Sequence, residues 1–244
     1  MQQHYNNYTN EDREVWKLLF ERQMPNIEQL ASLEYINGLS NIGFKSDKIP
    51  NFEESNLILG RQTGWSLEVV PGIIPVKEFF ELLAVKRFSA TTWLRKLEQL
   101  DYLEEPDMFH DVFGHVPLLT NSLFCDFFQG LAKIGLKHVD NPLILEMLGK
   151  IYWFTVEFGL IQEKNQLKIY GAGILSSPGE TQFCMTNKCE RIPFDIKSII
   201  QTNYRTDVYQ EKYFVIQSFE QLFNCLENLE EIMAEEEARM LKLV

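Results

Sequence analysis

The amino-acid sequence predicts a mainly α-helical chain with a few short strands, an α+β arrangement within one compact domain. Apolar side chains recur three and four residues apart through most of the chain, which is the period of a buried helical face. Strand-like alternation is confined to short stretches. No repeat, low-complexity tract or Pro/Gly/Ser-rich linker interrupts the 244 residues, so we expect a single domain over residues 1–244 with its core in about 10–220.

The first helical pattern covers residues 11–38. Pro25 lies within it, and we expect this proline to interrupt the helix because it lacks a backbone N–H. The apolar side chains at the spacing of one buried face are Val15, Leu18, Leu19, Ile27, Leu30, Leu33 and Ile36.

A strand, a turn and a helix are expected next, in residues 65–83. The Pro-Gly pair at 71–72 indicates the turn, and Pro75 is suited to the first position of the helix. The side chains that alternate as in a short strand are Trp65, Leu67 and Val69.

The remaining chain predicts two longer helices. Residues 142–163 are expected to form one of them, with Asn141 as its amino-terminal cap. Residues 168–177 are expected to be extended or loop, ending in a Ser-Pro-Gly turn. The last helix is expected over about 218–243, and we interpret it as closing the core rather than binding a partner. Its apolar positions are Leu222, Phe223, Leu226, Leu229, Ile232 and Met233.

Charge and composition exclude several classes of partner. The formal net charge is −12, and Lys and Arg form no cluster, so nucleic-acid and membrane partners are not expected. The amino-terminal residues are polar and acidic, unlike a signal peptide, and no apolar run reaches the roughly 18–20 residues that span a bilayer. We therefore expect a cytoplasmic protein whose four cysteines are reduced, buried thiols.

The segment "PDMFHDVFGH", residues 106–115, contains His110 and His115 in an otherwise apolar setting. Neutral imidazoles bind metal ions. Five residues turn a straight α-helix by about 140° beyond a full turn, so the two rings share a face only if the helix ends or distorts between them. Gly114 and Pro117 are expected to end it.

A third ligand is offered by "IYWFTVEFGLI", where Glu157 is the one carboxylate in an apolar helical run. A bare carboxylate is costly to bury, so Glu157 either faces solvent or has a strong partner such as a metal ion. Two histidines and one carboxylate suit Fe(II) in an oxygenase or Zn²⁺ in a hydrolase, and ligand chemistry alone does not decide between them. The plain alternative is a pair of histidines bonded to backbone near a helix end.

Longer motifs carry a resemblance to a known family. The segments "EPDMFHDVFGHVPLL", "IYWFTVEFGL" and "YGAGILSSPGE", with "TGW…VPGIIP…EFF" upstream, resemble the tetrahydropterin-dependent aromatic amino acid hydroxylases, and within them the short bacterial phenylalanine 4-hydroxylases. The likeness runs from about residue 10 to about residue 220. It implies hydroxylation of L-phenylalanine to L-tyrosine with O₂, tetrahydrobiopterin or a related tetrahydropterin, and non-haem Fe(II). It places the iron ligands at His110, His115 and Glu157, and implies no catalytic residue beyond the metal centre.

The resemblance also implies binding residues. Arg95 falls on the arginine that holds the substrate carboxylate, a bidentate task that suits a guanidinium. On pattern alone, Arg95 would be a solvated helical residue, and Phe79 and Trp153 would belong to the core. The other positions that match the substrate pocket of the family are Pro106, Trp153, Phe158, Gly173 and Ser176. Those that match its pterin site are Gly72, Ile74, Phe79 and, through water, Asp111.

Departures from the family pattern narrow the expected oligomeric state and substrate. We expect the protein to lack the regulatory region and the tetramerisation helix of the animal members, which favours an unregulated monomer. Thr206 is not the aspartate typical of tyrosine hydroxylases, and Trp153 stands where tryptophan hydroxylases usually carry phenylalanine. Phenylalanine is therefore the expected substrate, in phenylalanine catabolism or in tyrosine supply.

Three other functions stay open. The first is hydroxylation of another aromatic amino acid, tryptophan. The second is a His₂Glu zinc hydrolase, although the HExxH pattern is absent and Asp111 is its only candidate base. The third is a catalytically silent domain that binds an amino acid or a structural metal, against which the joint retention of the three ligands, Arg95 and Phe79 argues.

Overall fold

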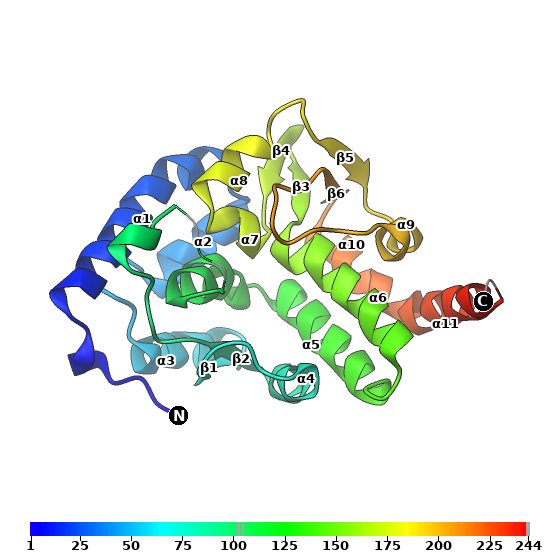
Figure 1. Ribbon diagram of the computed structural model, residues 1–244, viewed down its shortest axis with the longest axis horizontal. Coiled ribbons are helices and arrows are strands. Elements are labelled where there is room, and N and C mark those ends of the chain that lie inside the picture. The colour runs from blue at the N-terminus through cyan, green and yellow to red at the C-terminus, as the bar shows by residue number, and fades with distance from the viewer. Residues whose placement is uncertain (102, 104, 243–244) are drawn as a thin grey trace.

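The computed structural model describes residues 1–101, 103 and 105–242. Three helices build the amino-terminal part, drawn in blue and light blue in Figure 1. Thr9 begins the first of them through a capping box, in which its hydroxyl accepts from the Asp12 N–H and the Asp12 carboxylate accepts from the Thr9 N–H. The bounds are Asn10–Leu30 for α1, Leu33–Ile42 for α2 and Phe52–Gln62 for α3.

The predicted interruption at Pro25 is wrong, because the helical pattern breaks at Ala31 and Ser32 instead. Pro25 is exposed inside α1, so water can bond the carbonyl that the proline leaves without a donor. Ala31 pairs with Ile169 of a distant strand, and the Ser32 N–H donates to the Ile169 carbonyl at 2.7 Å. Leu33 therefore starts a new helical phase, and this residue, predicted to be buried, is 49% exposed.

The predicted strand, turn and helix of residues 65–83 are confirmed. The strand β1 pairs in parallel with a second strand, with Ser66 opposite Arg87, and the helix α4 connects the two. Trp65, just before β1, is fully buried and stacks on Phe128 with ring centroids 5.6 Å apart. The bounds are Ser66–Val69 for β1, Val76–Ala84 for α4 and Arg87–Ala90 for β2.

Residues 142–163 do not form one long helix. Asn141 caps the helix α6 as predicted, by accepting from the N–H groups of Leu143 and Ile144. The helix α6 ends at Tyr152, a π-helical turn follows, and residues 160–163 are a strand. That strand pairs with segments far along the chain, a non-local contact that helical periodicity does not reveal. The bounds are Ser122–Lys137 for α5, Pro142–Tyr152 for α6, Trp153–Glu157 for the π-helical turn and Leu160–Glu163 for β3.

A four-stranded sheet has the order β4-β3-β6-β5, and β4 is antiparallel to β3 while the other pairs are parallel. Residues 168–177, expected as extended or loop, contain the end of β4 and the short helix α7. The predicted turn at 177–179 is the start of α8, because the Ser177 hydroxyl caps that helix. The bounds are Gln166–Ile169 for β4, Ala172–Leu175 for α7, Pro178–Phe183 for α8, Glu190–Pro193 for β5, Ile196–Gln201 for α9 and Lys212–Ile216 for β6.

The carboxyl-terminal segment is helical, as predicted, but it is broken by a 3₁₀ turn. The fully buried side chains of Leu222, Leu229 and Met233 show that it closes the core. Residue 243, at the predicted end of this helix, lies outside the described residues. The bounds are Phe219–Asn224 for α10, Cys225–Asn228 for the 3₁₀ turn and Leu229–Leu241 for α11.

The elements enclose one core. Figure 1 shows α5 and α6 between the two-stranded sheet at the bottom of the view and the four-stranded sheet at the top. All four cysteines are free thiols, two of them buried and two partly buried. Among the described residues, no helix is both long and apolar enough to cross a membrane.

Candidate metal centre

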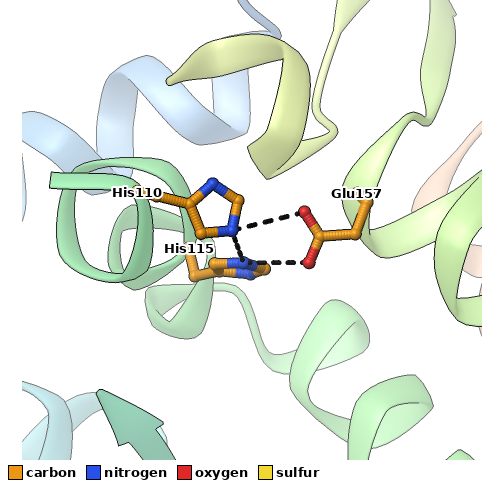
Figure 2. Close-up of side chains that lie close together, drawn as sticks. All are labelled: His110, His115 and Glu157. Carbon is orange, nitrogen blue, oxygen red and sulfur yellow. Dashed lines mark hydrogen bonds and ion pairs between the residues drawn. The ribbon is translucent and has the colours of Figure 1, made fainter. Parts of the chain in front are cut away.

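Two histidines are brought together by a π-helical segment, Phe109–His115. Its backbone hydrogen bonds close five residues apart, so His110 and His115 lie next to each other on one face. Their Nε2 atoms are 3.3 Å apart (Figure 2). The prediction that the helix ends at Gly114 and Pro117 is wrong: the helix distorts instead, and a 3₁₀ segment continues it to Thr120.

Glu157 completes the cluster from the second π-helical turn, which extends α6. Its Oε1 lies 3.2 Å from His115 Nε2 and its Oε2 lies 3.6 Å from His110 Nε2. Figure 2 shows the two histidines of one segment and Glu157 of another pointing at one another. The ligand atoms lie within 4.8 Å of one another, and both Glu157 and His115 are buried.

The charge on Glu157 is maintained by its neighbours. Burial by itself favours the neutral acid, but His115 and His110 beside the carboxylate, with the donor groups of His115 and Tyr152 nearby, lower the pKa of Glu157 to about 2. Two nitrogen ligands and one ionised carboxylate in a buried position form a donor set that suits a divalent cation of the Fe(II) or Zn²⁺ type.

A hydrogen-bond chain fixes the tautomer of His110. The Ser176 hydroxyl donates its single proton to the Ala172 carbonyl at 2.9 Å. Ser176 Oγ therefore accepts from His110 Nδ1, which lies 2.9 Å away. The proton on Nδ1 leaves the lone pair on Nε2, the atom that faces His115 and Glu157, so His110 is prepared to bind a metal through Nε2.

An ion pair lies beside the histidines. Arg95 donates from Nε and Nη2 to the two carboxylate oxygens of Asp107, each at 2.9 Å, and Asp107 is fully buried. Asp107 also accepts from the backbone N–H groups of Arg95 and His110. Burial opposes the charge of this carboxylate, yet the contacts with Arg95 hold the pKa of Asp107 below its ordinary value.

Comparison with known proteins identifies the family. Residues 3–237 match the family model described as biopterin-dependent aromatic amino acid hydroxylase. The chain belongs to this family. Over 226 residues it is 46% identical to the phenylalanine-4-hydroxylase of Ralstonia nicotianae, an alignment that covers 92% of this chain and 72% of the relative.

Solved structures of the phenylalanine hydroxylase of Chromobacterium violaceum share the fold. The structure with bound iron(III) and oxidised cofactor 7,8-dihydrobiopterin superposes with a TM-score of 0.89 at 43% identity, covering 94% of this chain and 86% of that one. The iron- and phenylalanine-bound structure gives a TM-score of 0.90 at 40% identity, covering 96% and 86%.

Most of the residues predicted to line the substrate pocket of this hydroxylase lie close together. Trp153 and Phe158 have ring centroids 4.6 Å apart. A Cβ added to Gly173 would lie 2.9 Å from the Phe158 ring, so glycine is what allows this packing. Ser176 is in the cluster through His110, and half-buried Pro106 directly precedes Asp107. Their roles toward a substrate stay predictions.

On the predicted pterin side, Phe79 and Asp111 approach the metal ligands by different routes. The ring of Phe79 packs edge-on against Tyr152 at 5.6 Å, and burial together with the nearby Glu157 carboxylate raises the pKa of the Tyr152 phenol well above its ordinary value. Asp111 lies within the π-helix and accepts from the N–H and the hydroxyl of Thr91 at 2.8 and 2.9 Å. Burial raises the pKa of Asp111. The predicted backbone contacts, Gly72 and Ile74, lie in the turn after β1.

Sequence reasoning missed several residues of the site. Asp107 could have been found, because a carboxylate beside the apolar run that contains His110 requires a partner as much as Glu157 does. Tyr204 and Gln210 gave no local signal. Tyr204 stacks on Trp153 with centroids 4.4 Å apart, and Gln210 accepts from Trp153 Nε1 at 3.0 Å, from a loop distant in sequence.

Proposed function

We propose that this chain hydroxylates L-phenylalanine to L-tyrosine, with O₂ and a tetrahydropterin, at Fe(II) held by His110, His115 and Glu157. The observation that supports this most is the convergence of those three ligand atoms in a chain of the biopterin-dependent family. The named relatives and the solved structures with iron, dihydrobiopterin and phenylalanine agree with it.

The three protein ligands define what the metal contributes. A cation held on one side by two imidazoles and a carboxylate keeps open positions, at which iron with a tetrahydropterin as electron donor supplies oxygen activation. The chain itself keeps Glu157 ionised and His110 in the Nδ1–H tautomer. The buried surroundings of the ligands exclude water from the reacting groups.

The substrate carboxylate is proposed to bind Arg95. Asp107 occupies Nε and Nη2 of this guanidinium, which directs Nη1 toward a second anion while the planar group stays fixed. The aromatic ring of the substrate is proposed to lie near Trp153 and Phe158, with Pro106, Gly173 and Ser176 around it. Fixed placement of the ring beside the metal is the main contribution of these residues to the rate.

The pterin is proposed to stack on Phe79 and to bond the backbone at Gly72 and Ile74. The geometry around Phe79 supports this, because its ring packs against Tyr152, whose phenol is near enough to Glu157 for that carboxylate to raise its pKa along with burial. A planar heterocycle stacked on Phe79 would therefore lie near the metal ligands. Asp111 uses one carboxylate oxygen for both Thr91 bonds, and the other oxygen is proposed to reach the pterin through water.

Two finer statements are also proposals. We place the protein in the cytoplasm, since its four cysteines are free thiols, as is usual in a reducing compartment. We propose a monomer, which light scattering after size-exclusion chromatography would test. A dimer or tetramer at micromolar concentration would contradict it.

The decisive assay is tyrosine formation from L-phenylalanine by protein loaded with Fe(II), in air, with a synthetic tetrahydropterin. Controls contain Zn²⁺ in place of Fe(II), or no pterin, and tryptophan is offered in parallel. Turnover that requires both iron and pterin supports the proposal. A preference for tryptophan would change the substrate. Bound iron without turnover of either amino acid would favour a silent domain or the hydrolase, and cleavage of an ester or amide substrate by the Zn²⁺-loaded protein would distinguish these two.

A further inference from the structure

The hydroxyl of Tyr35 contacts the segment that carries both imidazoles. Tyr35 is a fully buried residue of α2, and its hydroxyl donates to the Phe113 carbonyl at 2.5 Å. Phe113 lies in the π-helix, between the two predicted ligands. The rings of Tyr35 and Phe113 also pack edge-on, with centroids 6.2 Å apart. One side chain of α2 thus holds both the backbone and the side chain of Phe113.

Pro117 explains why the Phe113 carbonyl needs this donor. In an α-helix, the carbonyl of Phe113 would accept from the N–H of residue 117, and proline has none. A buried carbonyl without a donor is costly, so another group must replace the missing one. Tyr35 provides it, and burial raises the pKa of the Tyr35 phenol well above its ordinary value, which keeps the proton on the donor.

A second contact of α2 lies three residues further along, on the same helical face. A Cβ added to Gly38 would overlap the carbonyl oxygen of Pro117 and would lie 2.8 Å from Thr120 Oγ1. The close approach of α2 to the 116–120 segment therefore depends on glycine at position 38. Figure 1 shows α2 beside this part of the ribbon.

We infer that Tyr35 is a positioning residue for the proposed metal centre. Its hydroxyl, with the close fit of Gly38 against Pro117, holds residues 109–115 in the π-helical winding that puts His110 and His115 on one face. Tyr35 acts through the backbone of Phe113. The inference rests on the proposed function for the role of the two histidines, but the winding itself does not need a metal.

The test compares Tyr35→Phe with Tyr5→Phe. The control removes a similar bond, since the Tyr5 hydroxyl donates to the Ile49 carbonyl at 2.8 Å, outside residues 109–120. The first measurement is amide hydrogen exchange of the metal-free proteins. The second is Co(II) titration with the visible spectrum of the bound ion. Tyr35→Phe should speed exchange in residues 109–120 about 10-fold, weaken Co(II) binding about 10- to 100-fold as loss of an outer-shell partner does, and shift the spectrum. Tyr5→Phe should change neither.

Unchanged exchange in residues 109–120 and unchanged Co(II) affinity in Tyr35→Phe would overturn the inference. Wild-type protein that fails to bind Co(II) would instead refute the proposed metal site, while the exchange comparison would still decide the role of Tyr35.

A second variant, Pro117→Ala, tests the same idea with Tyr35 intact. It restores an N–H that can bond the Phe113 carbonyl in the α-helical way, and it should weaken Co(II) binding because α-helical winding turns the two imidazoles apart. In this background Tyr35→Phe should have a smaller effect than in wild type. Equal effects in the two backgrounds would contradict the claim that the Tyr35 hydroxyl and the N–H of residue 117 donate to the same Phe113 carbonyl.

Discussion

The two sides of the proposed active site are built differently. The segment 109–120, which carries both histidines, is helical throughout and almost wholly buried, and it packs against α2 and α7. The loop 202–210, which reaches Trp153, has no regular secondary structure and is mostly exposed. The ligand geometry therefore depends on the packing of the core, whereas the shape of the substrate side depends on a few polar contacts.

Gln210 makes most of these polar contacts. Its amide nitrogen donates to the carbonyls of Arg205 and Val208 at 2.7 and 3.2 Å, which turns its amide oxygen toward the indole N–H of Trp153. The backbone N–H of Gln210 donates to the buried carboxyl group of Glu180. This difference between the two sides predicts that substitutions on the ligand side abolish the reaction, while substitutions in the loop alter substrate preference.

The largest effect is expected for Glu157→Ala. Without this carboxylate the two histidines remain as ligands, so Fe(II) binding should weaken by more than about 100-fold, since even outer-shell partners are worth about 10- to 100-fold. Activity should fall below detection while the helical content stays the same. Glu146→Ala, which removes an exposed carboxylate of α6, is the control. Measured iron content and circular dichroism check this prediction. Iron retained in Glu157→Ala would show that Glu157 is not a metal ligand.

A smaller effect is expected for Arg95→Lys, because lysine keeps the charge beside Asp107 but loses the bidentate geometry. The apparent KM for phenylalanine should rise about 10-fold or more with iron still bound. Arg95→Ala should also lower the free energy of unfolding by about 3–5 kcal/mol, since it leaves the buried carboxylate of Asp107 unpaired. Steady-state kinetics and urea unfolding separate the two effects. Loss of iron in Arg95→Lys would show that Arg95 supports the metal ligands instead.

The sequence correctly predicted the elements whose structure depends on neighbouring residues. The cap at Asn141 and the strand, turn and helix of residues 65–83 depend on neighbouring residues, and both predictions are confirmed. The end of α6 and the break at Ala31 depend on strand pairing with distant segments, so periodicity misplaced both.

The candidate site divides in the same way. The sequence predicted that two histidines and one carboxylate in apolar runs lie together, because buried polar groups require partners. The π-helical winding that joins the histidines depends on Tyr35, which is distant in sequence. Gln210 is also remote in sequence from Trp153, so neither contact was visible in the sequence.

Two buried carboxyl groups should give opposite dependences of stability on pH. The pKa of Asp107 is lowered: burial opposes its charge, but Arg95 outweighs burial. Asp107 therefore contributes stability above its unfolded pKa near 3.8, and this contribution is lost as the pH falls through the lower folded value. Burial raises the pKa of Glu180 despite its bond with Tyr213. Its folded form binds the proton more tightly, so stability falls as the pH rises from the unfolded pKa near 4.5 through the folded value.

Urea unfolding as a function of pH checks both signs. Glu180→Gln keeps an acceptor for Tyr213 and for the Gln210 N–H but removes the ionisation, so the decline with rising pH should disappear. Asp107→Asn should instead lower stability at neutral pH, because Arg95 loses its charged partner. A Glu180→Gln protein with the wild-type pH profile would show that Glu180 is not the group responsible.

The smallest effect is expected for Gln210→Leu, which removes the acceptor of the Trp153 indole and the donor to two loop carbonyls. A net hydrogen bond is worth about 1 kcal/mol, so the ratio of kcat/KM for phenylalanine over tryptophan should fall about 5-fold, with iron affinity unchanged. Gln201→Leu, which removes a bond to Glu236 on α11, is the matched control. Equal loss of iron and activity in Gln210→Leu would mean that the loop also supports the ligands, and the division between the two sides of the site would not hold.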